Sequence, residues 1–489
     1  MSTVQASIQR GARRRLAQVS ALASGMPLRV VWARLRGLFV SRVRRQALLD
    51  QCHERNAARA LETMGQMKGA MMKLAQMVSY VSEDVPEAYR KQLAALQANA
   101  PAMDFDVIAV ELERELGSPL AASFAEIDPE PLAAASIGQV HRATLPSGEP
   151  VVVKVQYPGV EEAIRGDLKN VAWLHPLLGA VYPALETGPI VEELRDRILE
   201  ELDYETEARN QRAFAELWAG HPLVRVPRVC ESHSTGRVLT SAYAEGHDFT
   251  WLQAQPDAVR QRAAEVLYRF VFASMLHHRA FNGDPHPGNY RFDAEGRVTF
   301  LDFGCVKYFT AAITGGIRRL HCAYLDGDLP AMRRAVEGLG FLSEDTQIST
   351  ELYREYMGYF YRPFARDEEF EFTSEYTSRA TAHVMNMGDP RFGEVPKKSN
   401  MPRDLVFLNR LQWGLWPVLA SLRARNQWHR IHGEYIRDAS PSTELGRVFA
   451  DHRSRWRAER GFSPDGPVWL EPGGVRHGEP PTQGGPFAV

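Results

Sequence analysis

The chain has 489 residues, 44% hydrophobic and 24% charged, with 58 lysines and arginines against 60 aspartates and glutamates. This ordinary globular composition suits two or three structural units and excludes a small scaffold that needs disulfides or metals to fold. Four widely spaced cysteines without a C-x-x-C pair argue against a disulfide framework or a structural zinc site, so we expect a reducing compartment. No apolar run reaches the roughly 18 residues that a spanning helix needs, so we expect no transmembrane segment.

The N-terminal segment, residues 1–45, is basic and amphipathic. Residues 1–50 carry ten arginines and a single acid, Asp50, and so have a net charge of +9. The whole chain has a net charge of −2. Apolar residues such as Leu28, Trp32 and Leu35 share one arc of a helical wheel. Three interpretations stay open: a peripheral helix on anionic lipid, a docked structural helix, or a targeting segment. We expect no nucleic-acid partner.

A helical extension is predicted over residues 46–130. Met64, Met67 and Met71 repeat at three- and four-residue steps, a spacing that places them on one helical face and favours core packing. A second, shorter helix is predicted around residues 107–116, between turn signals.

A small mixed lobe is predicted over residues 131–246. Two β-branched runs, 139–145 and 151–157, flank Pro146-Ser147-Gly148-Glu149, which is a hairpin signal. A helix over residues 190–217 and a strand over 237–243 follow. The lobe therefore contains both helix and strand.

The larger lobe, residues 247–440, is predicted to be mainly helical, interrupted by residues 283–289 and by a strand over 298–301. A C-terminal extension covers residues 441–489. From about residue 461 it is predicted to be disordered, because seven glycines and six prolines fall within its last 29 residues.

A loop of small side chains precedes the first strand of the hairpin. Small side chains let backbone N–H groups approach phosphate oxygens. In the glycine-rich form G-x-G-x-x-G-x-V, Ala133 and Ala135 occupy the first two glycine places, and Gly138 and Val140 match. The predicted nucleotide-binding residues of this loop are Ala133, Ala134, Ala135, Ser136 and Gly138.

Lys154 lies fourteen residues after Val140, inside an apolar strand. A lysine there is costly to bury without a partner, and in this position it can hold nucleotide phosphates while bonded to a helical acid. The alternative is a lysine whose ammonium group reaches water. The candidate partners share one face of the predicted helix, and their spacing does not choose among them: Glu200, Asp203 and Glu207, with Tyr204 beside them.

The most specific pattern is Gly283-Asp284-Pro285-His286-Pro287-Gly288-Asn289, followed by a strand that ends in Asp302-Phe303-Gly304. Phosphoryl transfer needs a carboxylate beside the attacking group and oxygen ligands for Mg²⁺. A kinase catalytic loop supplies them as Asp-x4-Asn followed by Asp-Phe-Gly, and Asp284, Asn289 and Asp302 reproduce that order. We therefore expect Mg-ATP chemistry.

These motifs together resemble the UbiB/AarF family of atypical kinase-like proteins, over residues 46–430. The resemblance is carried by a K-x-G-Q-like motif, an alanine-rich loop, an E-x-D motif and the catalytic loop. In this sequence they are Lys73-Leu74-Ala75-Gln76, Ala133 to Gly138, Glu201-Leu202-Asp203, and Asp284 to Asn289.

The resemblance implies roles for individual residues. Lys154 should pair with Glu207, Asp284 should be the catalytic-loop acid, and Asn289 and Asp302 should hold Mg²⁺. A regulatory lid over the active site should be formed by Lys73 and Gln76, which would approach Glu201 and Asp203. Ala75 departs from the family glycine, and the polar Gly/Pro tail departs from members that end in membrane-spanning helices.

The predicted fold is α+β, a two-lobed protein-kinase-like fold with a helical N-terminal extension. The predicted function is an ATPase or a small-molecule or lipid kinase that uses ATP or ADP with Mg²⁺ and supports ubiquinone or other isoprenoid-lipid metabolism. Expected partners are the nucleotide and an anionic lipid or isoprenoid-lipid precursor. The expected location is cytoplasmic and peripheral to a membrane, or mitochondrial if the chain is eukaryotic.

Two alternatives belong to other classes. The first is a nucleotide-binding pseudokinase scaffold for a biosynthetic complex, which turnover rather than binding would distinguish. The second, an ordinary Ser/Thr protein kinase, is disfavoured because Asn282-Gly283 stands where a His-Arg pair usually precedes the catalytic aspartate.

Overall fold

The structure is a computed structural model in which the chain separates into two compact units. The first unit contains the described residues up to Tyr204 together with 231–240, and the second contains 205–230 and everything from Ser241 onward. The described residues are 102–134, 137–168, 195, 199–384, 389–400, 402, 405, 408, 411–463 and 466–478.

Several predictions fall outside these residues. They concern the basic segment 1–45, the methionine-rich helix with Lys73 and Gln76, and the loop residues Ala135 and Ser136. Over the described part, no helix combines the length and the apolar character that crossing a membrane requires.

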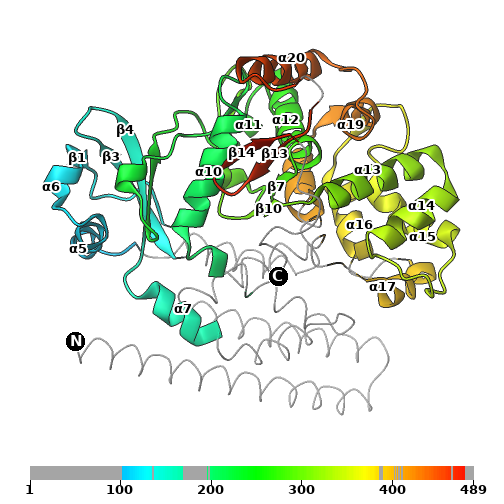
Figure 1. Ribbon diagram of the computed structural model, residues 1–489, viewed down its shortest axis with the longest axis horizontal. Coiled ribbons are helices and arrows are strands. Elements are labelled where there is room, and N and C mark those ends of the chain that lie inside the picture. Colours follow the sequence, from blue (N-terminus) through cyan, green and yellow to red (C-terminus); the bar gives the residue numbers. More distant parts are fainter. Residues whose placement is uncertain are drawn as a thin grey trace, which may run out of the picture. The chain divides into compact units, whose positions relative to one another are not determined.

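The sheet of the first unit is built on the predicted hairpin, which is confirmed (Figure 1). β3 (Gly138–Thr144) and β4 (Pro150–Gln156) pair antiparallel from Gly138 opposite Gln156 to Thr144 opposite Pro150. Gly148 turns the chain between them with a φ of 85°, a left-handed conformation that glycine adopts without strain. The sheet order is β1-β3-β4-β6, with β2 paired to β3; the other strands are β1 (Glu126–Ile127), β2 (Ala133–Ala134) and β6 (Val238–Ala242).

Helix α5 (Phe105–Leu116) belongs to this first unit and confirms the short helix predicted there. Ile108 and Leu112, one helical turn apart, are fully buried. The helix ends at Gly117, which has a φ of 67° and donates its N–H to the Glu113 carbonyl. The other helical segments of this unit are α6 (Leu120–Ser123), α7 (Val160–Leu168) and η2 (Glu231–His233).

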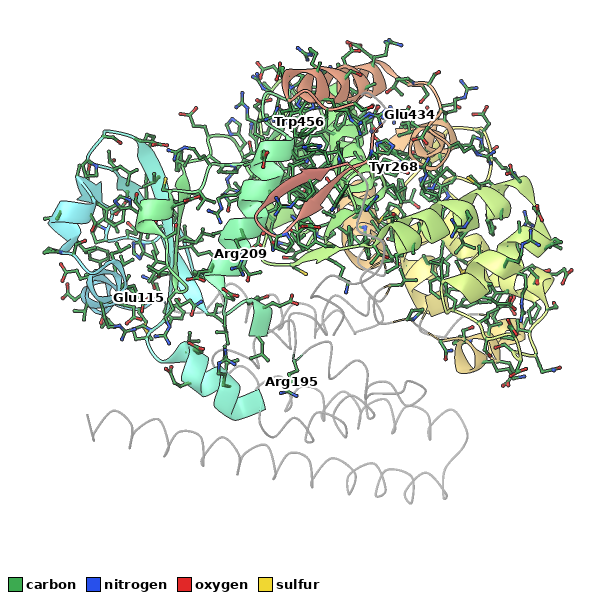
Figure 2. All side chains as sticks on the ribbon, in the orientation of Figure 1. Glu115, Arg195, Arg209, Tyr268, Glu434 and Trp456 are labelled. Atoms are coloured by element: carbon green, nitrogen blue, oxygen red, sulfur yellow. The ribbon has the colours of Figure 1, made fainter. Side chains whose placement is uncertain are left out.

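The second unit is mainly helical, as predicted, around an aromatic core. The rings of Phe270 and Phe300 stack with centroids 3.6 Å apart, and Tyr268 and Trp428 lie 4.8 Å apart. Figure 2 shows Tyr268 within the dense side-chain packing of this unit. Its α-helices are α10 (Tyr204–Leu217), α11 (Phe249–Gln253), α12 (Asp257–Phe272), α13 (Ala311–Asp326), α14 (Leu329–Gly338), α15 (Thr350–Tyr361), α16 (Ser374–Val384), α17 (Val395–Lys398), α18 (Trp416–Ser421), α19 (Trp428–Ile436) and α20 (Glu444–Glu459).

Short sheets, 3₁₀ turns and π-helical turns interrupt these helices. The sheets pair β8 with β9 and β9 with β5, β7 with β10, β11 with β12, and β13 with β14. The strands are β5 (Val224–Arg225), β7 (Ala280–Asn282), β8 (Tyr290–Phe292), β9 (Val298–Phe300), β10 (Val306–Tyr308), β11 (Phe370–Glu371), β12 (Arg425–Asn426), β13 (Val468–Glu471) and β14 (Gly474–His477). The 3₁₀ turns are η4 (Pro287–Asn289) and η5 (Pro390–Phe392), and the π-helical turns are η3 (Ala273–His277) and η7 (Leu411–Leu415).

Helix α10 is counted with the larger unit, whereas the sequence suggested a boundary at residue 246. The reason is its buried face. Phe214 and Trp218 pack on Phe270, with ring centroids 5.8 and 5.4 Å away, and Phe214 packs on Phe303 at 5.0 Å. This aromatic contact area stabilises the helix on the second unit.

The predicted disorder from about residue 461 is wrong for residues 466–478, which contain the hairpin β13–β14. Val468, Trp469 and Leu470 are buried, and the Leu470 N–H donates to the His278 carbonyl at 2.9 Å. Gly473, with a φ of 97°, allows the two-residue turn. Three large apolar side chains were enough to fix a strand in a glycine-rich segment.

The predicted helix over residues 190–217 is wrong at Glu201 and Asp203, which were expected to lie within it. Helix α10 begins at Tyr204, so Glu201 and Asp203 precede it in a turn. The turn is closed by bonds from the Leu202 N–H to the Leu199 carbonyl and from the Asp203 N–H to the Glu200 carbonyl. Because these bonds span three residues rather than four, the helical register is broken before Tyr204.

Candidate active site

The catalytic loop and the Asp-Phe-Gly segment lie next to each other in the second unit. β7 leads into the loop and pairs with β10, which follows Gly304. The Gly283 N–H donates to the Cys305 carbonyl at 2.7 Å, and the Leu301 N–H donates to the Asn289 carbonyl at 3.0 Å. The two motifs are thus joined at both ends by backbone hydrogen bonds.

Asn289 and Asp284 are in direct contact. The Asn289 amide Nδ2 donates to the Asp284 carbonyl at 3.1 Å and to its carboxylate Oδ2 at 2.9 Å. The 3₁₀ turn η4 sets this geometry, because the Asn289 N–H bonds to the His286 carbonyl and the His286 N–H bonds to the Asp284 carbonyl. The structure therefore brings together the first two of the predicted catalytic and metal-binding residues.

Asp302 is held by its own turn. Its Oδ1 accepts the Gly304 N–H at 3.0 Å, and its carbonyl accepts the Asn282 amide at 2.8 Å. Asn282 also accepts the Asp284 N–H, at 3.3 Å. One asparagine side chain thus bonds both the loop of Asp284 and the segment of Asp302.

Glu207 lies beside the same segment within the second unit. It is buried, and a Cβ atom on Gly304 would lie 3.4 Å from both Glu207 Oε2 and Asp302 Oδ1. One turn further along α10, the Asn210 amide donates to the Phe303 carbonyl at 3.0 Å and accepts the Tyr308 hydroxyl at 2.8 Å. Helix α10 is therefore hydrogen-bonded to the Asp-Phe-Gly segment.

Sequence reasoning missed Asn282, Asn210 and Tyr290. Asn282 had a usable signal, since it directly precedes the loop glycine, but Asn210 is recognisable only from the fold. Tyr290 follows Asn289, and its pKa is raised by burial and, to a smaller extent, by the negative charge of Asp284. Its hydroxyl therefore stays protonated beside the loop.

In the first unit, the first two residues of the alanine-rich loop are paired with the start of β3. Ala133 pairs with Val140 and Ala134 with Gln139. A Cβ atom on Gly138 would lie only 2.2 Å from the Val155 carbonyl oxygen, so a glycine is required at this position.

Lys154 lies in β4 opposite Val140, and its ammonium group is 4.8 Å from the centre of the Tyr204 ring. A cation over an aromatic face is stabilised electrostatically. Lys154 belongs to the first unit and Glu207 to the second, and their pairing stays a prediction. The same holds for the lid, because Lys73 and Gln76 lie outside the described residues.

The donor set suits magnesium better than a transition metal. Among the described residues, no group of three or more His, Cys, Asp and Glu side chains could hold a metal ion. Magnesium is usually bound by one or two protein oxygens together with substrate phosphates and water. Asn289 directs its Nδ2 to Asp284, which places its Oδ1 at the opposite end of the amide, and Asp302 supplies a carboxylate. The residues present therefore fit a phosphate-bound Mg²⁺.

Residues 95–336 match the family model of the ABC1 atypical kinase-like domain. The chain carries an ABC1 atypical kinase-like domain. This confirms the resemblance to the UbiB/AarF family that the motifs predicted, and the α+β kinase-like fold with it. All the described site residues named above lie within the matched range.

Two relatives support the assignment. The atypical kinase COQ8B, mitochondrial, of Rattus norvegicus is 30% identical over 329 residues, which are 67% of this chain and 62% of that protein. An uncharacterized aarF domain-containing protein kinase, chloroplastic, of Arabidopsis thaliana is 33% identical over 297 residues, 60% of this chain and 42% of that protein. The chain thus spans less than two thirds of the length of either relative.

A solved structure has the same fold as the kinase-like domain and its surroundings. It is the structure of Rv3197 from Mycobacterium tuberculosis, described as a complex with erythromycin. The TM-score is 0.58 at 26% sequence identity, over 80% of this chain and 98% of that one. The similarity therefore extends well beyond the residues that the family model matches.

Proposed function

We propose that this kinase-like domain hydrolyses Mg-ATP or transfers its γ-phosphoryl group to a small or lipid-linked acceptor. The observation that carries the proposal is the hydrogen-bonded pair of Asp284 and Asn289, which Asn282 joins to the segment of Asp302. Asp284, Asn289 and Asp302 have the chemistry and chain order that phosphoryl transfer requires.

In this proposal each predicted residue has a defined task. Asp284 orients the attacking hydroxyl or water, and Asn289 and Asp302 provide oxygen ligands to Mg²⁺, which neutralises phosphate charge when bound. Lys154, paired with Glu207, holds the α- and β-phosphates. The loop from Ala133 to Gly138 covers the nucleotide with backbone N–H groups.

We further propose that turnover serves isoprenoid-lipid metabolism, including that of ubiquinone, at a membrane surface. Two observations support this. A relative is named as a mitochondrial atypical kinase, COQ8B, and the basic residues 1–45 suit an anionic surface, where each arginine contributes about 1 kcal/mol. A peripheral location at an organellar or bacterial inner membrane follows from the same proposal.

The deciding measurement is steady-state phosphate release from Mg-ATP by the wild type and Asp302→Asn. Loss of a magnesium ligand should lower turnover at least about 100-fold, because the developing phosphate charge is no longer neutralised. Asp128→Asn is a matched control: Asp128 Oδ1 also accepts the N–H two residues ahead, from Glu130 at 2.9 Å, and it lies in no predicted site. Undiminished release by Asp302→Asn would exclude the mechanism.

The same assay tests the membrane role and the scaffold alternative. Anionic liposomes containing an isoprenoid-quinone precursor mimic should increase phosphate release, and deletion of residues 1–45 should abolish liposome co-sedimentation. Nucleotide-dependent thermal stabilisation without any release, under all conditions, would instead favour a nucleotide-binding scaffold.

A further inference from the structure

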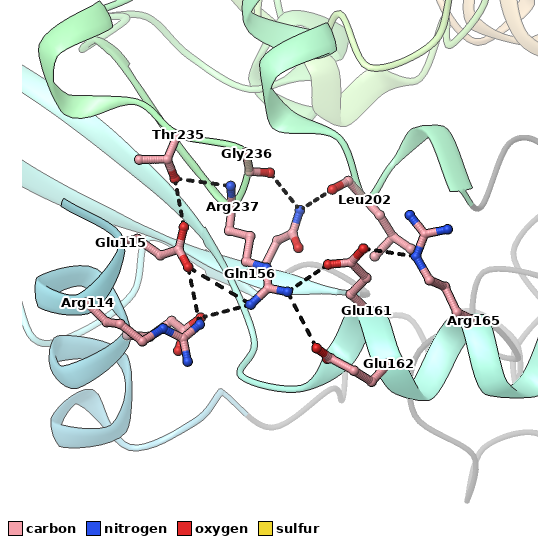
Figure 3. A network of polar contacts seen from close by, with 11 residues as sticks. Arg114, Glu115, Gln156, Glu161, Glu162, Arg165, Leu202, Thr235, Gly236 and Arg237 are labelled. Atoms are coloured by element: carbon pink, nitrogen blue, oxygen red, sulfur yellow. Dashed lines mark hydrogen bonds and ion pairs between the residues drawn. The ribbon is translucent and has the colours of Figure 1, made fainter. Parts of the chain in front are cut away.

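Gln156, the last residue of β4, bonds to two backbone segments that are remote from it in sequence. Its side-chain amide donates to the Leu202 carbonyl at 2.9 Å and to the Gly236 carbonyl at 3.5 Å. Its backbone N–H donates to the Arg237 carbonyl at 3.0 Å. Figure 3 shows the amide between the two acceptors. Leu202 is the central residue of the acidic turn Glu201-Leu202-Asp203.

Gln156 also shares a strand face with Lys154. Residues two apart in a strand point to the same side of the sheet. Gly236, which accepts a hydrogen bond from Gln156, is linked to Lys154 through Tyr204. The Tyr204 N–H donates to the Gly236 carbonyl at 3.1 Å, and the Tyr204 ring lies 4.8 Å from the Lys154 ammonium group. Gln156 therefore fixes the lysine strand and the acidic turn relative to each other.

The hydrogen-bonding chemistry at this place requires a donor. Both side-chain partners of Gln156 are carbonyl oxygens, and the side chain is only 1% exposed. A carboxylate would face these oxygens with a negative charge, and an apolar side chain would leave them without this donor. Only an amide supplies two N–H groups without a charge.

An ion cluster holds the turn that contains Gly236 and Arg237 in place. The Arg237 guanidinium pairs with Glu161 at 2.7 Å and Glu162 at 3.5 Å on α7, and with Glu115 at 4.0 Å on α5 (Figure 3). The hydrogen bond from Arg237 lowers the pKa of Glu161, and the Arg165 guanidinium adds to the effect. These ion pairs thus fix the position of the Gly236 carbonyl, to which the Gln156 amide donates.

We propose that Gln156 is a positioning residue that holds the acidic turn Glu201-Leu202-Asp203 in register with the strand of Lys154, and thereby keeps the Lys154 ammonium group aimed at the nucleotide phosphates. The inference rests on the proposed Mg-ATP function. Gln156 itself does not touch the substrate. It sets the distance between the phosphate-binding lysine and the turn through two hydrogen bonds to backbone.

The first test compares Gln156→Met with the wild type in Mg-ATP turnover. Methionine keeps the length and shape of the side chain and removes both N–H donors. The KM for Mg-ATP should rise about tenfold, because the lysine and the turn lose their register. A purely structural role would lower the amount of active protein, and hence the apparent kcat, without changing KM. An unchanged KM would overturn the proposal.

Gln261→Met is the matched control. Gln261 also joins distant backbone, with its amide donating to the Arg423 carbonyl at 3.0 Å and accepting the Arg425 N–H at 2.8 Å, and it lies in no predicted site. This variant should keep the wild-type KM. An equal rise in KM in both variants would contradict a specific role for Gln156.

Gln156→Glu provides a second test that does not depend on the methionine variant. A protonated carboxyl group can donate one hydrogen bond to the Leu202 carbonyl, whereas the carboxylate cannot, and burial raises the pKa of such a group. The kcat/KM of this variant relative to the wild type should therefore fall as the pH rises from about 5 to 8. A ratio that is constant over this range would overturn the donor role.

Binding of Mg-ADP separates the two proposals. If the wild type binds Mg-ADP but releases no phosphate, the proposed turnover fails, while the Kd of Gln156→Met for Mg-ADP still tests positioning. A rise in that Kd of about tenfold supports the positioning role, and an unchanged Kd overturns it. If the wild type turns over and the variant has the same KM and Kd, only the positioning role fails.

Discussion

Asn289 donates its side-chain amide to Asp284 twice, to the carbonyl oxygen at 3.1 Å and to the carboxylate at 2.9 Å. Two residues that the kinase pattern separates by four positions are thus one hydrogen-bonded unit. The contact orients the Asp284 carboxylate and, through the same amide, the oxygen that is proposed to bind Mg²⁺.

Replacing Asn289 by Asp should abolish most of the turnover. The new carboxylate would lie within hydrogen-bonding distance of the Asp284 carboxylate. Repulsion between the two negative charges raises the pKa of one of these groups, so that they are not both ionised. We expect phosphate release to fall about 100-fold and to require more Mg²⁺ for half-maximal rate. A magnesium titration of phosphate release measures both.

The control for that change is Asn426→Asp. In the wild type, the Asn426 amide donates to the Glu265 carboxylate at the same distance, 2.9 Å. Asn426 lies in no predicted site, so this variant should keep the wild-type magnesium dependence. A shift of the magnesium midpoint in this control would show that the first effect is not specific to the catalytic loop.

Gly138→Ala should destabilise the first unit and weaken nucleotide binding. The added Cβ would lie 2.2 Å from the Val155 carbonyl oxygen, so the backbone of the hairpin must move. Overpacking of this kind costs about 1–3 kcal/mol. Gly166→Ala in α7 has no heavy atom within 4 Å of the new methyl group and should stabilise the helix by about 0.5–1 kcal/mol. Urea unfolding of the two variants should show shifts of opposite sign.

Arg269→Met should strongly destabilise the second unit. Arg269 is fully buried and pairs with Glu265 at 2.8 Å and Glu434 at 2.7 Å, and both acids are buried as well. Removing the arginine leaves two buried carboxylates without their counter-charge, which costs about 3–5 kcal/mol. Thermal and urea unfolding measure the loss. Arg430→Met, at the exposed pair with Asp367, should leave the midpoints almost unchanged.

Stability should fall on acidification because of His221. Burial, and then the charges of His452 and Arg455, lower its pKa to about 3, whereas the unfolded chain has a pKa of about 6.5. Between these values the unfolded state binds more protons, so the free energy of unfolding decreases as the pH falls, by up to about 1.4 kcal/mol per pH unit.

His221→Asn should reduce this pH dependence. The His221 Nδ1 accepts the N–H groups of Leu223 and Val224, and an asparagine oxygen can accept the same bonds without titrating. Urea unfolding at pH 7.5, 6.0 and 5.0 measures the slope. His477→Asn, on the surface, should keep the wild-type slope, and a wild-type slope in His221→Asn would contradict the assignment.

The sequence was sufficient where the signal is local. The β3–β4 hairpin follows from two short β-branched runs around one Gly turn, and the loop of Asp284 and Asn289 follows from a fixed spacing. The structure has the hairpin as predicted and brings Asp284 and Asn289 into contact. The roles of Asp284, Asn289 and Asp302 and the pairing of Lys154 with Glu207 remain predictions, because they depend on a bound nucleotide and metal and on contacts between distant segments.

The sequence was insufficient where a contact joins distant segments. Nothing near Gln156 or Asn210 indicates that their amides bond to the Leu202 and Phe303 carbonyls, which lie 46 and 93 residues away. The helical prediction for Glu201 and Asp203 failed for the same reason. The Tyr204 N–H bonds to the carbonyl of Gly236 rather than to the preceding turn, and no local propensity records that choice.

The C-terminal hairpin β13–β14 has a consequence for synthesis on the ribosome. Leu470 of β13 bonds to the carbonyl of His278, a few residues ahead of the catalytic loop, and Trp456 of α20 donates its indole N–H to the Glu216 carbonyl near the end of α10. These contacts cannot form until the C-terminal segments have emerged from the exit tunnel. A nascent chain that stops at residue 336 therefore leaves part of the core around α10 and η3 uncovered.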